Sequence, residues 1–240
     1  MKTLVLASLI AASATGCIIS SDSGSAHVGA TWQVKSVVSN QEIGCPSGID
    51  TAALVNQPVD INGNAVGQPI IDLFDCAAGV GTSASLPATT YETWVQLTDH
   101  PGTTIYAKGL PAFLDVTDTD LTYNTDILDD GGYFALAWNL VGQATNAPLT
   151  CAQAGVSGSS SGVEMLINIS GTMTMDMDQF PCEDGQGISK GYAEGSYTVS
   201  VDAFNPSGQV SDSVVKGNQT ISGPNMVTDL GTATIPITGM

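Results

Sequence analysis

The strongest constraint on this chain is an internal repeat with a fixed spacing of 106 residues. It maps Trp32, Cys45, Cys76 and Tyr91 onto Trp138, Cys151, Cys182 and Tyr197. The chain holds only three tryptophans and five cysteines, so a chance match is a poor explanation. Self-similarity at a fixed spacing indicates repeated structural units. We therefore expect a first domain at residues 28–130 and a second, homologous domain at residues 131–240.

The repeat also predicts how the cysteines pair. Apart from Cys17, four cysteines remain, which allows three pairings. Each domain holds two of them at the same separation of 31 residues, which favours disulfides Cys45–Cys76 and Cys151–Cys182. Disulfides persist in exported proteins, and a loop of this length is worth about 3–4 kcal/mol in the chain-entropy model. Metal binding is the alternative, but no C-x-x-C spacing is present and only two histidines could assist.

Most of the chain shows strand patterns. Alternation of β-forming residues predicts strands at 91–97 and 197–204. Asn62-Gly63 predicts a hairpin turn, and Ser170-Gly171 a second one that is two residues out of step with the repeat. Gly195-Ser-Tyr197 resembles the approach to the late strand of bacterial immunoglobulin-like sandwiches, where a tyrosine packs at a sheet corner. We therefore predict an all-β protein of two tandem immunoglobulin-like β-sandwiches, each with one internal disulfide.

The first residues have the pattern of a targeting segment. Lys2 precedes an apolar stretch, residues 4–14, that is too short to span a bilayer. The stretch runs into Ala14-Thr15-Gly16-Cys17, which resembles a bacterial lipobox except that leucine is commonest at the place of Ala14. The resemblance implies a signal peptide at 1–16, lipidation of Cys17 and a polar tether at 17–27. A plain secretory signal is the alternative. No aspartate follows the cysteine, and by analogy this implies a cell-envelope location at the outer membrane.

Composition excludes several classes of function. Five lysines, no arginine and 23 acidic residues give a formal net charge of −18. A conventional nucleic-acid binder needs a basic face for phosphates, so that class is excluded. Adsorption to anionic lipid by charge is disfavoured as well, which leaves the lipid as the expected membrane anchor. Nucleophilic and phosphoryl-transfer chemistry lack their usual groups, since the domains offer one histidine, His100 at a predicted turn, no arginine and no free cysteine, while His27 lies in the tether.

A dense acidic cluster lies at the predicted domain junction. Alternate aspartates present oxygens that suit a hard cation such as Ca²⁺. No EF-hand loop is present, so a solvated acidic linker is the competing interpretation, and no other cofactor is expected. The cluster comprises Asp115, Asp118, Asp120, Asp126, Asp129 and Asp130.

Two further patterns each have a functional and a structural interpretation. Asp72 and Asp178 are equivalent in the repeat and could form a glycosidase pair only if the domains faced each other. A polar contact with the backbone near each disulfide is the simpler interpretation. Met173, Met175 and Met177 alternate and could present thioethers to Cu(I), whereas three core-facing side chains are simpler.

Trp94 is the candidate ligand contact. An odd step separates it from Tyr91, so the two side chains point to opposite faces of a strand. If Tyr91 is buried, Trp94 is exposed and can stack on a sugar; its equivalent is Ser200, so this role belongs to the first domain. We therefore predict a non-catalytic binding or adhesion module whose partner is an envelope protein or a glycan. An assembly component that uses sheet-edge contacts is the alternative, and a carboxylate-based hydrolase is a third hypothesis.

Overall fold

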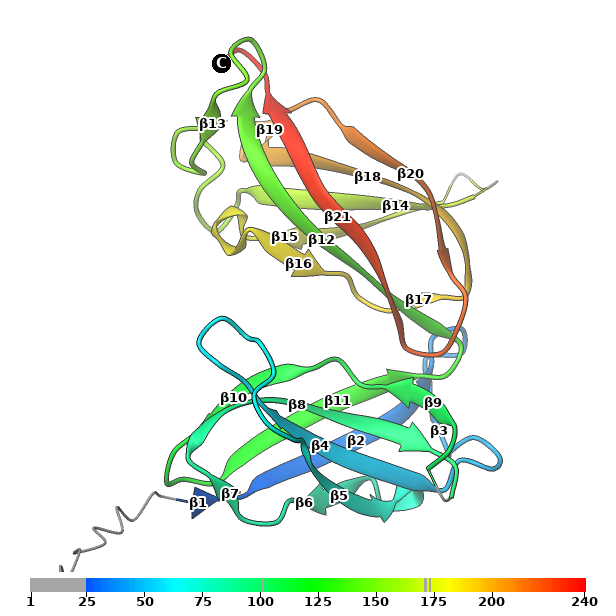
Figure 1. Ribbon diagram of the computed structural model, residues 1–240. Helices are drawn as coiled ribbons and strands as arrows, with labels where there is room; N and C mark the ends of the chain where they lie inside the picture. Colours follow the sequence, from blue (N-terminus) through cyan, green and yellow to red (C-terminus); the bar gives the residue numbers. More distant parts are fainter. Residues whose placement is uncertain (1–24, 101, 171, 173) are drawn as a thin grey trace, which may run out of the picture.

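The computed structural model describes residues 25–240 except 101, 171 and 173. Two β-sandwiches follow each other along the chain and meet near residue 130 (Figure 1). The predicted signal peptide, Cys17 and most of the tether lie outside the described residues. Within the described part, no helix is long and apolar enough to cross a membrane.

The first sandwich packs two main sheets against each other. Its elements are β1 Ser25–Ala26, β2 Val28–Ser36, β3 Gln41–Ile43, β4 Thr51–Pro58, β5 Ile70–Asp75, η1 Cys76–Ala78, β6 Val80–Thr82, β7 Leu86–Pro87, β8 Thr89–Thr98, β9 Ile105–Lys108, β10 Ala112–Val116 and β11 Leu121–Leu128. The β4 sheet has the order β10-β8-β4-β5, with β9 also on β8. The β2 sheet has the order β11-β2-β3, with β6 also on β2, and β1 pairs with β7.

The second sandwich repeats this arrangement. Its elements are β12 Gly131–Gly142, β13 Pro148–Leu149, β14 Gly162–Ile169, β15 Met175–Phe180, η2 Cys182–Asp184, β16 Gln186–Ile188, β17 Tyr192–Ala193, β18 Gly195–Asn205, β19 Gly208–Gln209, β20 Val214–Ile221 and β21 Met226–Ile237. The β14 sheet has the order β15-β14-β18-β19, with β20 on β18. In the β12 sheet, β13, β16, β17 and β21 all pair with β12. The final strand of each sandwich, β11 or β21, runs parallel to the first long strand.

The predicted fold class is confirmed, and the repeat explains how each core is closed. The disulfides are Cys45–Cys76 and Cys151–Cys182, as the repeat predicts. Each repeated tryptophan is buried and donates its indole N–H to a cysteine carbonyl: Trp32 to Cys76 at 2.9 Å, and Trp138 to Cys182 at 3.0 Å. The strand that opens each sandwich is thus tied to the turn that carries its disulfide.

The tyrosine corners also repeat. Tyr91 donates its hydroxyl to the carbonyl of Pro87 at 3.0 Å, and Tyr197 donates to Ala193 at 2.6 Å. Both tyrosine rings are buried in the core of their own sandwich. These bonds pin the start of β8 and of β18, which supports the predicted resemblance to immunoglobulin-like sandwiches.

The structure differs from the sequence-based expectations in three places. Ser25–Ala26, expected in the tether, form β1, so the first sandwich starts earlier than residue 28. The Asn62-Gly63 turn is only the tip of a longer connection between β4 and β5, braced by the Asp60 side chain. The second hairpin differs from the first by more than the predicted two residues. Met165 on β14 occupies the place of Leu54 on β4, an offset of 111 instead of 106.

Asn225 of the second sandwich fixes the joint between the two units. Its side-chain oxygen accepts the N–H of Leu128 at 2.7 Å, and its side-chain amide donates to the carbonyl of Lys108 at 2.7 Å. Its own N–H donates to Gly131 at 2.7 Å. The residue is buried and has a left-handed backbone with φ of 51°. Both side-chain bonds reach into the first sandwich, so this one residue ties the units together.

We expect Asn225→Ala to lower the free energy of unfolding by about 2 kcal/mol, because two buried backbone groups of the first sandwich lose their partner. The measurement is denaturant unfolding of the whole chain. Asn146→Ala is the matched control, since Asn146 has the same left-handed backbone, with φ of 54°, but is exposed. Equal losses in the two variants would show that the backbone conformation, and not the joint, accounts for the effect.

Candidate ligand-binding site

The outer face of the β4 sheet carries an apolar groove. Its volume is about 390 Å³, within the range typical of ligand pockets. The lining residues come from β4, β5, β8 and the loops at their ends: Thr51, Ala53, Val55, Pro69, Ile71, Leu73, Trp94, Gln96, Thr98, His100 and Gly102. None of them is acidic, although the protein has a formal net charge of −18.

The register of three strands builds this groove. Across the sheet, Ala53 lies between Leu73 and Gln96, and Val55 lies between Ile71 and Trp94. Ala53 and Val55 are buried and form the floor. Ile71 and Leu73 stand on the edge strand β5 and are 52% and 68% exposed. Two exposed apolar side chains stand beside a buried apolar floor. A partner that removed them from water would be bound favourably.

Trp94 forms one wall of the groove, which corrects the sequence-based prediction. It lies on the face opposite the buried Tyr91, as expected. However, it is only half-buried between its neighbours, and the Lys108 ammonium lies 3.7 Å from the centre of its ring. A cation held over the indole is a favourable contact, so that side of the ring is occupied. Trp94 is therefore a wall residue and not the freely exposed stacking platform that the sequence predicts.

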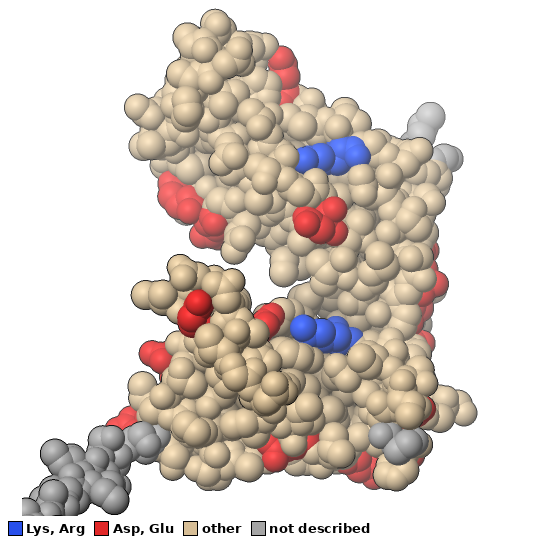
Figure 2. Space-filling view, in the orientation of Figure 1, with Lys and Arg blue, Asp and Glu red and all other residues tan. Residues whose placement is uncertain are grey.

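Charge is uneven around the groove. Lys108 makes no ion pair with any described residue. His100 lies at one end, where a neighbouring hollow includes Asp50 and Asp75. On the face that Figure 2 shows, acidic residues are scattered and lysines are few. The groove is thus lined by no acidic residue and has one cation beside its tryptophan.

The equivalent surface of the second sandwich is more polar, although Met177 takes the place of Ile71 and Leu166 that of Val55. Glu164 and Asp202 lie directly opposite each other on β14 and β18, where the first sandwich has Ala53 and Gln96. Gln179 donates to Glu164 at 3.3 Å, and Ser213 donates to Asp202 at 3.0 Å. Asp202 is 1% exposed, and burial together with Glu164 raises the pKa of its carboxyl to about 6. Burial and the opposing carboxylate both disfavour the charged form of Asp202.

The six clustered aspartates do not converge. Asp126 pairs with Lys35 at 2.6 Å, and Asp120 accepts the N–H of His27 at 2.8 Å. Asp129 accepts the Tyr106 hydroxyl, and Asp130 accepts Ser36 and the N–H of Val37, both at 2.6 Å. Asp115 and Asp118 are exposed. No three acidic, histidine or cysteine side chains gather as a metal site among the described residues, which include all six aspartates.

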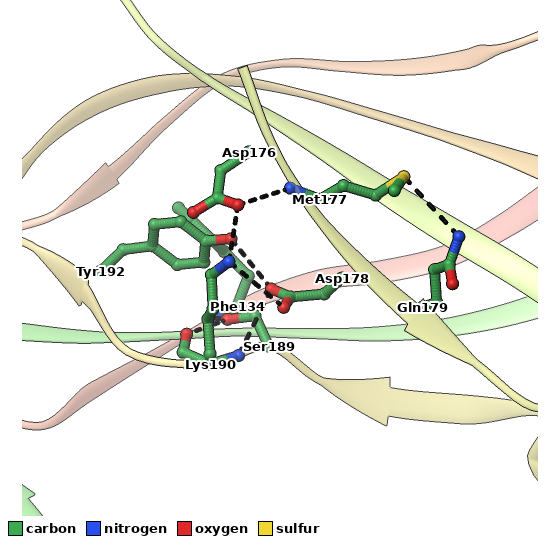
Figure 3. A network of polar contacts seen from close by, with 8 residues as sticks. All are labelled: Phe134, Asp176, Met177, Asp178, Gln179, Ser189, Lys190 and Tyr192. Atoms are coloured by element: carbon green, nitrogen blue, oxygen red, sulfur yellow. Dashed lines mark hydrogen bonds and ion pairs between the residues drawn. The ribbon is translucent and has the colours of Figure 1, made fainter. Parts of the chain in front are cut away.

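Asp72 and Asp178 each serve their own sandwich. Asp72 accepts the N–H of Ala84 at 3.1 Å, and Asp178 accepts the equivalent N–H of Lys190 at 3.3 Å. These are the backbone contacts that the structural interpretation expects. Asp178 also accepts the Tyr192 hydroxyl at 2.9 Å, within a network that includes the ion pair of Lys190 with Asp176 (Figure 3). Burial and the neighbouring Asp178 raise the pKa of Tyr192.

The methionine prediction is wrong in one respect. Met175 and Met177 do not face the core: they are 60% and 45% exposed on the outer face of the edge strand β15. Their cross-strand neighbours are Asn168 and Leu166. Because the side-chain period of a strand is two, Asp176 and Asp178 take the inner direction instead. Met173 lies outside the described residues.

Sequence reasoning missed most of the groove. Ile71 and Leu73 alternate with Asp72 and Phe74, a period-two signal that places them opposite the aspartate. The contribution of Lys108 has no such signal. It reaches Trp94 because β9 pairs with β8 so that Lys108 lies opposite Gln96. That pairing is a tertiary property.

We expect Asp202→Asn to stabilise the protein above pH 6. The pKa of Asp202 in the folded protein is raised from the usual 3.8 to about 6. The folded state therefore keeps the proton over a pH range in which the unfolded state has lost it, and the free energy of unfolding falls as the pH rises from 4 to 6. The gain at pH 7.5 should be on the order of 2 kcal/mol and should vanish below pH 4. The measurement is denaturant unfolding at a series of pH values. Asp212→Asn, an exposed change of equal charge, is the control; a similar gain there would point to overall repulsion instead.

We expect calcium to leave the melting temperature unchanged within about 1 °C, because four of the six aspartates already bind protein donors and the set does not converge. The measurement is thermal unfolding in excess Ca²⁺ and in excess chelator. A clear upward shift in Ca²⁺ that is lost in Asp118→Asn or Asp120→Asn would restore the calcium hypothesis.

Comparison with known proteins assigns no family. No protein-family model matches the chain, and no curated protein matches it.

Among solved structures, a leucine-rich repeat protein from Bacteroides thetaiotaomicron is 18% identical over 90% of this chain, with a TM-score of 0.32. The chain spans only 26% of that protein. The minor pilin GBS52 of Streptococcus agalactiae is 10% identical over 90% of this chain and 97% of its own, with a TM-score of 0.32. The shaft pilin SpaA of Lactobacillus rhamnosus GG is 11% identical over 90% and 99%, with a TM-score of 0.25. These structural similarities are too weak to assign a function to the chain.

Proposed function

We propose that this chain is a non-catalytic binding module of the bacterial cell envelope, held at the membrane by a lipid on Cys17. Its contact site is the groove on the β4 sheet. The observation that carries the proposal is the pair of exposed side chains Ile71 and Leu73 beside the buried floor of that groove.

The second sandwich provides an internal comparison for this site. The same fold position there holds Glu164, Gln179 and Asp202, and the sandwich still forms. The architecture therefore does not require apolar residues at the places of Ala53 and Leu73, although Met177 takes the place of Ile71. Their presence in the first sandwich, in a chain with a formal net charge of −18, indicates a surface that a partner covers.

The proposed anchor is compatible with the charge of the protein. Anionic lipid headgroups repel an acidic protein body, so adsorption by charge does not hold it at a membrane. The residues from Cys17 to Ser25 can span at most about 29 Å when fully extended. A lipid on Cys17 would therefore keep the first sandwich close to the membrane.

An assembly role through the sheet edge is the second candidate function. Strand β5 pairs only with β4 among the described residues, and it carries both exposed side chains of the groove. An unpaired edge with exposed apolar side chains can accept an added strand from a partner. A glycan would contact the groove alone, whereas a protein strand would contact the groove wall and the edge.

We expect Leu73→Asp and Trp94→Ala each to reduce partner capture at least about tenfold, because each removes an apolar contact at the centre of the site. The immobilised mature chain is exposed to solubilised envelope, and bound protein and sugar are identified by mass spectrometry and sugar analysis. Val215→Asp is the matched control, since Val215 is 66% exposed on the second sandwich.

The outcomes separate the alternatives. A glycan lost in both groove variants supports a glycan-binding module. A discrete protein lost in both supports the assembly role. Capture that Val215→Asp impairs as strongly as Leu73→Asp would remove the groove from consideration. No specific capture by the unmodified chain would overturn the binding function itself.

A further inference from the structure

Two methionines with exposed side chains lie on one strand of the second sandwich, outside the groove and outside the core. Met175 and Met177 occupy alternate positions on β15 and point to the same outer face. Neither belongs to the buried cluster of this sandwich. The Met177 side chain points away from the Asp176–Lys190 pair, and its only recorded polar contact is a long one of 3.8 Å from Gln179 (Figure 3).

Core packing does not account for these methionines. The equivalent positions in the first sandwich are Pro69 and Ile71, which are also apolar but carry no sulfur. Apolar side chains without sulfur therefore fit these two positions of the fold. What the second sandwich adds is a pair of soft, neutral sulfur donors.

The geometry of a strand allows both sulfurs to reach one ion. Alternate residues on one face lie roughly 6.8 Å apart along the strand. Methionine is unbranched and has three rotatable bonds, so the two thioethers can swing toward a common point. The side-chain oxygen of Asn168, directly across from Met175, is buried and has no hydrogen-bond partner among the described residues. It offers a neutral oxygen at the residue across from Met175.

The chemistry of the donors selects the metal. Thioethers are soft ligands that favour Cu(I) over hard cations such as Ca²⁺ and Mg²⁺. No thiolate competes within the described residues, because all four cysteines there are in disulfides. The acidic surface raises the local concentration of cations of any kind.

We propose that Met175 and Met177 bind a single Cu(I) ion, with the Asn168 oxygen as a weaker third donor. The site lies on β15 and is separate from the groove, so it does not depend on the proposed binding function. Asp176 and Asp178 belong to the inner-face network and take no part.

The test is competition for Cu(I) against a coloured copper(I) chelator, bathocuproine disulfonate, under anaerobic conditions with ascorbate. The protein is the mature chain with both disulfides intact and with Cys17→Ser, which removes the one cysteine outside the two disulfides. We expect it to withdraw one equivalent of copper. Met175→Leu and Met177→Ile should each weaken binding at least about tenfold, and the double variant should abolish it. Met177→Ile installs the residue that the first sandwich carries at this position.

Two controls keep the test decisive. Met226→Leu removes another exposed methionine, 40% exposed, and should leave binding unchanged. In the unmodified protein, Cu(I) should shift the NMR signals of the Met175 and Met177 methyl groups and not that of the buried Met165, a result that does not depend on any variant folding. The proposal is overturned if the protein withdraws no copper, if the double variant binds as well as the original, or if Met175 and Met177 do not shift.

Discussion

Each sandwich depends on one buried hydrogen bond, from a tryptophan indole to the carbonyl of a disulfide-bonded cysteine. Trp32 reaches Cys76 and Trp138 reaches Cys182 across the core. An indole N–H buried without an acceptor costs free energy, so the ring and the turn hold each other in place. The disulfide then ties that turn to the segment that precedes β4 in the first sandwich and β14 in the second. The same turn is therefore held by both the tryptophan and the disulfide. Residues on the outer faces of the sheets take no part in these contacts and can differ between the two sandwiches.

The two sandwiches use that freedom differently. At one pair of equivalent positions the first has Ala53 and Gln96, and the second has the Glu164–Asp202 carboxyl pair. On the neighbouring edge strand, Ile71 of the first corresponds to Met177 of the second. The differences lie on outer faces, while the tryptophan, disulfide and tyrosine contacts stay the same. The proposed sites therefore depend on a few side chains placed on a duplicated scaffold.

The sequence predicts what scarce residues determine and misses what register determines. Tryptophan, cysteine and tyrosine recur at one spacing because each has a fixed place in the core, so the fold class and both disulfides follow from them. The opposition of Glu164 and Asp202 depends on β14 being displaced by five residues relative to the repeat, which no local pattern reveals. The same holds for the methionines: alternation shows that they share a face, but only the strand pairing shows that the face is the outer one.

Lys108 connects the joint with the groove. Its carbonyl accepts the Asn225 amide of the second sandwich, and its ammonium lies over the ring of Trp94. The backbone of β9 is thus held from the second sandwich at the residue whose side chain covers one side of the groove wall. A single cation on a flexible stem would otherwise sample many positions, and ordering it costs conformational entropy. The pairing of β9 with β8 places Lys108 opposite Gln96, and the Asn225 bond holds the same backbone from the second sandwich, so both halves of the chain position the residue from which this side chain extends.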